Sequence, residues 1–306
     1  MFKDMSDEDI DNMVMSFKMA DYKWIFLSLI MGVLSHWSRA YRWLFTLEPI
    51  GIKPKLSNAF YTVMIGYLAN LLIPRAGEVS RCAFMAKHEK APFDKLFGTV
   101  IAERIADLIL LVSLIFITIV SQYDILFGFI QELSFYKKLQ QPTNIIIAVL
   151  AVGVVFFFIY RLIKRSNQPL IIKLRTFISG IKEGVLSILR MKKVGWFLFH
   201  TFFIWGMYLG MFWITIYCLP ELENLSFGAI LSGFVIGGIS IAATNGGLGA
   251  YPLGIMTVLA LYGIQEQVGL AFGWIVWVAQ TAMIIVLGLA SFILIEITNK
   301  SNVKVQ

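Results

Sequence analysis

The sequence is poor in the residues that build metal centres, disulfide frameworks and water-facing surfaces. It contains only two cysteines and three histidines, and neither type occurs at metal-ligand spacing. We therefore expect no disulfide framework, no metal site and no other cofactor. Charged residues make up 15% of the chain, whereas a soluble domain has about 25%. The net charge of +7 is spread between apolar segments, so it indicates membrane topology rather than a nucleic-acid partner.

Long apolar segments occupy most of what remains. Hydrophobic residues make up 58% of the 306 positions, and the mean hydropathy is +0.76. Because about 20 apolar residues cross a hydrocarbon layer, the composition predicts an all-α, polytopic integral membrane protein with about eight transmembrane helices. Residues 226–264 could instead form a re-entrant segment. The predicted spans, within a single transmembrane domain of residues 22–296, are 22–45, 57–74, 97–120, 143–163, 194–218, 226–244, 248–264 and 268–296.

The segments outside these spans give the expected orientation. Residues 1–21 are predicted to be a cytoplasmic amphipathic segment, and residues 297–306 a cytoplasmic tail. The stretch 168–190 is predicted to be an interfacial helix, since its apolar residues recur at every third or fourth position. Placing the N-terminus inside puts most lysines and arginines on the cytoplasmic side. Both termini are therefore predicted to be cytoplasmic, with the protein in the cell (inner) membrane.

Three charged residues in the predicted span 97–120 form the first candidate site. Glu103 and Asp107 lie four residues apart on one helix face, and Arg104 can pair with Asp107. A charge at membrane depth costs at least about 2.5 kcal/mol, so such residues are candidates for function. Two interpretations remain open: an ion-pair lock that holds helices together, or a direct part in binding a polar group.

The second candidate site is a helix break within residues 66–81. A proline and a glycine interrupt the helix, and arginines, which suit bidentate binding of phosphate, gather around the break. The alternative is that these arginines only mark the cytoplasmic end of a span. The residues concerned are Asn70, Pro74, Arg75, Gly77, Glu78 and Arg81.

A glycine-rich break in residues 239–254 is the third candidate. Asn245, Gly246, Gly247 and Gly249 interrupt an otherwise apolar stretch. Interrupted helices in both halves of a transporter point to a binding site, although Asn-Gly-Gly also suits a simple turn between two spans. We therefore expect a turn, and its part in conformational change stays open.

The first predicted span carries a further set of polar residues. His36, Arg39 and Arg42 step by three along its outer half, among several aromatic residues. Aromatic and basic residues of this kind are enriched where a membrane helix meets the interface. We interpret the set as an interfacial belt.

Taken in order, the three candidate motifs resemble the lysylphosphatidylglycerol synthase transmembrane-region family, also called flippase-like proteins. The resemblance covers nearly the whole chain in span number and motif order. The family commonly has a proline before the late glycines and a glutamate after them, whereas here Asn245 precedes them and no acid follows. The resemblance is carried by Asn-x3-Pro-Arg-x-Gly-Glu-x2-Arg at 70–81, Glu-Arg-x2-Asp at 103–107 and Gly-Gly-x-Gly at 246–249.

The resemblance implies a flippase or transporter that moves a phosphate-bearing lipid, anionic or zwitterionic, or a lipid-linked group between the leaflets of a bacterial inner membrane. In bifunctional relatives a soluble aminoacyl transferase domain follows the spans. Because no such domain follows here, we expect no enzymatic activity, and we expect membrane lipids as partners. One alternative is a non-transporting scaffold or regulator of envelope synthesis, with envelope-synthesis proteins as partners. Another is an integral membrane transferase acting on a polyprenyl-linked substrate.

Overall fold

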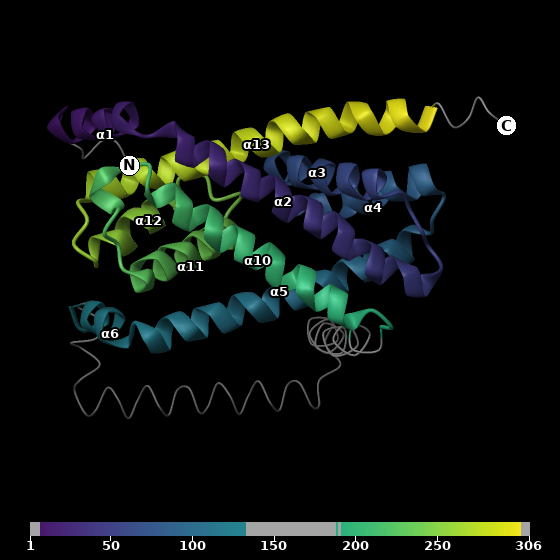
Figure 1. The fold of residues 1–306 in the computed structure, drawn as a ribbon, viewed down its shortest axis with the longest axis horizontal. Coiled ribbons are helices and arrows are strands. Elements are labelled where there is room, and N and C mark those ends of the chain that lie inside the picture. Colours follow the sequence, from purple (N-terminus) through teal and green to yellow (C-terminus); the bar gives the residue numbers. More distant parts are fainter. Residues whose placement is uncertain (1–6, 133–187, 189–190, 301–306) are drawn as a thin grey trace, which may run out of the picture.

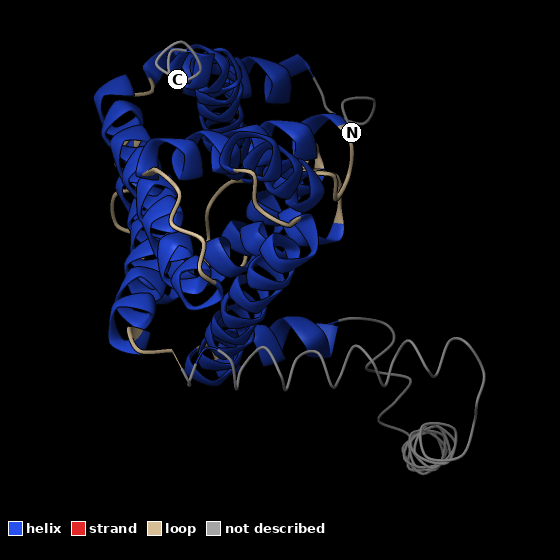
Figure 2. Cartoon of the chain, turned by 90° about the vertical axis from the view of Figure 1, so that its right-hand side faces the viewer, coloured by secondary structure: helices blue, strands red, loops and turns tan. Residues whose placement is uncertain are grey.

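The computed structural model describes residues 7–132, 188 and 191–300. This part of the chain contains ten α-helices, two short 3-10 helices and no strand, and Figure 2 shows it as helices joined by loops. The fold class is therefore all-α, as predicted. Within the described residues, three helical segments are long and apolar enough to cross a membrane: Phe93–Ser121, Val194–Ile216 and Glu266–Asn299.

Most predicted spans coincide with helices to within a few residues, but 143–163 and nearly all of 168–190 lie outside the described residues. Which helices cross the membrane stays a prediction. The α-helices are α1 (Asp7–Met19), α2 (Tyr22–Leu47), α3 (Leu56–Leu72), α4 (Gly77–Glu89), α5 (Phe93–Ser121), α6 (Tyr123–Glu132), α10 (Val194–Ile216), α11 (Phe227–Ala243), α12 (Ala250–Ala260) and α13 (Glu266–Lys300). The 3-10 helices are Glu48–Ile50 and Pro220–Leu222.

Helix α2 buries a stripe of small and polar residues beside the apolar Trp43 and Leu47. The Asp21 carboxylate caps its first turn by accepting a hydrogen bond from the backbone N–H of Lys23 (3.1 Å). In a membrane the lipid accommodates apolar side chains, so polar and small residues turn toward other helices. The buried stripe runs through Ser28, Gly32, Ser35, Arg39, Arg42 and Thr46, which are spaced three or four residues apart.

Helices α3 and α4 form a hairpin. At its tip, the Asn70 side chain accepts a hydrogen bond from the backbone N–H of Gly77 (2.7 Å). At its open end, Asn58 on α3 donates to Glu89 on α4 (2.6 Å). The start of α3 and the end of α4 therefore lie at the same end of the molecule. The predicted spans leave residues 75–96 as a loop, and the structure differs because the chain turns back at Pro74 and packs α4 along α3.

Helices α11 and α12 form a second hairpin. Three glycines with positive φ, Gly246, Gly247 and Gly249, make its turn. At the open end, the hydroxyl of Ser232 lies 2.8 Å from that of Tyr262. With 11 residues, α12 is about 16 Å long, roughly half of a hydrocarbon layer. This length favours the re-entrant alternative for residues 226–264.

The long helices α2, α5, α10 and α13 run between the two ends of the molecule, and Figure 1 shows the hairpins at opposite ends. The backbone N–H of Asp21 donates to Cys218 at the α1 end (2.9 Å). At the other end, Asn299 near the end of α13 donates to Asn58 (3.0 Å). We name this the lysine end after its exposed residues Lys53, Lys55, Lys87, Lys90, Lys95, Lys192 and Lys193.

Helix α1 and the last turns of α13 thus lie at opposite ends. Eight predicted spans would place both termini on one side of the membrane, and the orientation of these ends relative to the membrane stays a prediction.

We predict that Gly77→Ala destabilises the α3–α4 hairpin. A Cβ at Gly77 would collide with the Asn70 amide and with the Gly66 carbonyl oxygen, a backbone atom that cannot move without separating the two helices. The matched control is Gly98→Ala in α5, where a Cβ meets nothing within 4 Å. This control should keep or slightly raise stability, since alanine favours a helix by about 1 kcal/mol over glycine. Melting temperatures of the purified chains test both, and equal values would contradict the close packing.

Candidate functional site

The candidate site begins with a buried carboxylate on α5. Asp107 accepts hydrogen bonds from Arg39 Nη1 (2.7 Å) and Arg42 Nη1 (2.8 Å), and Arg42 Nη2 adds a third at 3.2 Å. Arg42 is fully buried and also donates to the hydroxyl of Thr201 on α10 (3.0 Å). These charge-assisted bonds tie α2 to α5 and α10.

A second buried carboxylate connects α5 to the α3–α4 hairpin. Glu103 is 0% exposed, and its Oε2 accepts a hydrogen bond from Arg81 Nη1 over 3.0 Å. The Arg81 guanidinium lies over the ring of Trp43, with its Cζ 3.7 Å from the ring centroid. Trp43 Nε1 in turn donates to the hydroxyl of Thr99 on α5 (2.9 Å). Arg81 is therefore fixed on one edge by a carboxylate and on one face by an aromatic ring.

A third pair of charges is held more loosely. Arg104 Nε lies 3.4 Å from Glu78 Oε1, without hydrogen-bond geometry, and Arg104 Nη1 lies 4.0 Å from Asp107 Oδ2. The side chains of Arg104 and Glu78 are 41% and 28% exposed. This pair can separate at a smaller cost than the buried pairs, since its charges are partly exposed.

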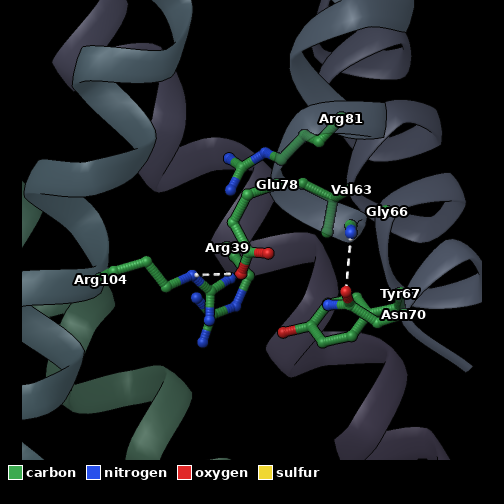
Figure 3. A pocket seen from close by; sticks show the side chains of 9 residues that line it. Arg39, Val63, Gly66, Tyr67, Asn70, Glu78, Arg81 and Arg104 are labelled. Atoms are coloured by element: carbon green, nitrogen blue, oxygen red, sulfur yellow. Dashed lines mark hydrogen bonds and ion pairs between the residues drawn. The ribbon is translucent and has the colours of Figure 1, made fainter. Parts of the chain in front are cut away.

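The loose pair borders a narrow pocket of about 20 Å³ between α2, α3, α4 and α5. Figure 3 shows Arg39, Glu78 and Arg104 converging on it, with Arg81 above them. Arg81 is only 3% exposed, and its Nε and Nη2 have no hydrogen-bond partner among the described residues. The lining residues are Arg39, Val63, Gly66, Tyr67, Asn70, Gly77, Glu78, Arg81 and Arg104.

Hydroxyl groups extend the polar region toward the middle of the molecule. The hydroxyls of Tyr67 and Tyr208 lie 3.2 Å apart, and Arg39 Nη2 donates to Tyr208 over 3.5 Å. The ring of buried His36 packs on Tyr67, with 4.6 Å between centroids. Glu103 and Asp107 lie about 15 and 21 Å along α5 from its first residue. The network is therefore at a depth where unpaired charge is costly.

The structure brings together six of the residues that the sequence pointed to, namely Asn70, Glu78, Arg81, Glu103, Arg104 and Asp107. It places Arg75 apart from them, exposed at the hairpin tip with a φ of 63°. Asn245 is likewise exposed, in the turn between α11 and α12. The part of Arg75 in binding stays a prediction, as does the part of the glycine turn in movement.

The two interpretations of the α5 charges apply to different residues. Glu103 and Asp107 are held in ion pairs with arginines of other helices, which is the lock. Arg104 lines the pocket, and a direct part of any of the three in binding a polar group stays a prediction.

The interpretation of His36, Arg39 and Arg42 as an interfacial belt is wrong. All three are less than 5% exposed, and the two arginines are the partners of Asp107. The signal that could have found them is their membership of the small and polar stripe of α2, which marks an inward face in a membrane helix.

These features define a polytopic α-helical membrane protein with a buried, arginine-rich pocket. The chain matches the lysylphosphatidylglycerol synthase TM region family over residues 2–288 and belongs to that family, which confirms the resemblance drawn from the motifs. A UPF0104 membrane protein from Methanocaldococcus jannaschii is 28% identical over 110 residues. That alignment covers 35% of this chain and 32%, about a third, of the relative. No solved structure matches the chain.

We predict that Asp107→Asn lowers the free energy of unfolding by about 3–5 kcal/mol, because it leaves two buried arginines without their counter-charge. Asp94→Asn is the matched control, since Asp94 is exposed in the first turn of the same helix. Thermal unfolding of the purified chains measures both. A small and equal loss in the two variants would show that the buried network does not hold the helices together.

Proposed function

We propose that the chain moves a phosphate-bearing lipid between the leaflets of the cell (inner) membrane. The observation that carries this proposal is the buried Arg81, which lines a pocket together with Arg39 and Arg104 and whose Nε and Nη2 have no hydrogen-bond partner among the described residues. A buried donor without a partner is costly, so such a group calls for a ligand or water. Membership of the family supports a lipid-related role.

Arginine suits this task because its planar guanidinium binds phosphate through two parallel hydrogen bonds. A head-group phosphate between Arg81 and Arg104 would replace Glu78 as the neighbour of Arg104. The acyl chains would stay in the surrounding lipid. We propose no chemical step for the chain, and we propose membrane lipids as its partners.

The two hairpins suggest how the pocket changes sides. A Cβ built on Gly246 would lie 3.5 Å from Leu71 near the tip of α3, so the turn of the second hairpin reaches the tip of the first. Trp277 Nε1 donates to the Gly246 carbonyl (2.8 Å) and connects that turn to α13. We propose that the hairpin tips separate when the lipid passes, with the glycine turn absorbing the backbone change.

We also propose that the lysine end is cytoplasmic. It has seven exposed lysines, whereas the described part of the α1 end has two, Lys18 and Lys23. Cytoplasmic loops of membrane proteins carry the excess of positive charge. The C-terminal end of α13 is then cytoplasmic, as the sequence analysis expected. Helix α1 is then on the opposite side, because α2 runs from one end to the other.

Labelling of introduced cysteines tests this orientation. We predict that a membrane-impermeant maleimide labels Lys18→Cys in intact cells, and labels Lys95→Cys only after the membrane is opened. The native Cys82 and Cys218 are buried, so the unmodified chain is the background control. The reverse pattern would place α1 in the cytoplasm and contradict the proposal.

A proteoliposome assay tests translocation. Head-group-labelled phosphatidylglycerol, phosphatidylethanolamine and a polyprenyl phosphate are each incorporated with the protein, and a membrane-impermeant quencher reports the accessible fraction. We predict that at least one lipid is quenched beyond the half that faces outward. Arg104→Gln should stop at half with normal protein abundance, because it removes a ligand-facing charge and spares the pairs made by Asp107 with α2.

Lys192→Gln is the control for this assay, since it removes an equal charge from an exposed position outside the pocket. Loss of translocation in both variants would mean that the pocket is not the binding site. If every lipid stops at half with the unmodified chain, even under imposed ion gradients, the translocation proposal fails.

A further inference from the structure

We infer that the pocket is matched to a single negative charge, so that its ligand is a phosphodiester lipid rather than a phosphomonoester, and that Glu78 sets this preference. The inference rests on the proposed function, because it takes the pocket as the head-group site. Its basis is the balance of charges in and around the pocket, together with the different ways in which those charges are held.

The described charged groups of the network have a net charge of one positive unit. Four guanidiniums, those of Arg39, Arg42, Arg81 and Arg104, stand against the three carboxylates of Glu78, Glu103 and Asp107. An uncompensated charge at this depth is unfavourable. One bound negative charge would make the site neutral, and a second would leave it with an excess of the opposite sign.

The surplus charge is located on the ligand-facing side of the network. Arg39 and Arg42 each hold Asp107 at hydrogen-bond distances of 2.8 Å or less. Arg81 uses Nη1 for Glu103 and keeps two nitrogens without partners among the described residues. Arg39, which also lines the pocket, keeps only its Nε without a partner in the described part of the chain. The largest free donor capacity in the pocket therefore belongs to Arg81 and to the loosely held Arg104.

Glu78 is the only carboxylate among the residues described as lining the pocket. Its carboxylate lies beside Arg104, at the position that the phosphate of a ligand would take. A ligand with one negative charge can displace it from Arg104 and still find a neutral site. A ligand with two negative charges meets the repulsion of the Glu78 carboxylate without a further cation to offset it.

A pair of ligands that differ by one methyl group and one charge tests this inference. Short-chain phosphatidylmethanol is a phosphodiester with a single charge. Phosphatidic acid of the same chain length is a phosphomonoester, whose second ionisation lies near a pH of about 6. The affinity of the purified full chain for each ligand is obtained at a pH of about 8 from the shift in its melting temperature with ligand concentration.

We expect the unmodified chain to bind phosphatidylmethanol at least tenfold more tightly than phosphatidic acid. In Glu78→Gln this ratio should fall at least tenfold, chiefly through tighter binding of phosphatidic acid, because the surplus charge rises to two. Glu223→Gln removes an equal charge from an exposed residue at the α1 end and should leave the ratio unchanged.

The ratio of the two affinities, measured on the unmodified chain, tests the single-charge match even if Glu78→Gln fails to fold. Equal affinity for the two ligands, or an unchanged ratio in a folded Glu78→Gln, overturns the inference and leaves the translocation result untouched. A clear preference for phosphatidylmethanol, found together with no translocation of any lipid, supports the charge match and defeats the transport proposal instead.

Discussion

The ion pairs that Asp107 makes with Arg39 and Arg42 are the constraint on which the rest of the structure depends. Charges this deep are tolerated only when each has a partner, and the partners come from different helices. Because α2 must lie against α5 at this level, the stripe of small residues on α2 faces inward. The same requirement draws Glu103 to Arg81 and so fixes the position of α4.

The α3–α4 hairpin places the charged residues of α4 where a simple membrane span could not. Helix α4 carries Glu78, Arg81 and Lys87, too many charges for a segment surrounded by lipid. As one arm of a hairpin it can place Arg81 against Glu103 while Lys87 stays exposed at the lysine end. Gly66 and Gly77 permit this arrangement, because α3 and α4 approach too closely there for a side chain on Gly77.

The sequence could predict the parts of this site that depend on single residues. Charge within an apolar run placed Glu103 and Asp107 at depth, and the glycine cluster predicted the turn before α12. The partners could not be predicted in the same way, because Arg39 near a helix end looks like an interfacial residue until the facing carboxylate is known. The hairpin was also missed. Hydropathy shows that a helix ends at Pro74, but it cannot show that the next one turns back.

The charges of the network are held with different strength, and the proposed ligand would meet only the loosely held ones. Pairs that are fully buried and closely hydrogen-bonded cannot be exchanged for a lipid phosphate without loosening the fold. The pair of Arg104 with Glu78 can be exchanged, because it is partly exposed and poorly aligned. In the proposed transport, an anion would therefore enter beside Arg104 while Asp107 keeps its arginines. This separation would allow a head group to be bound and released without breaking the contacts that hold the bundle together.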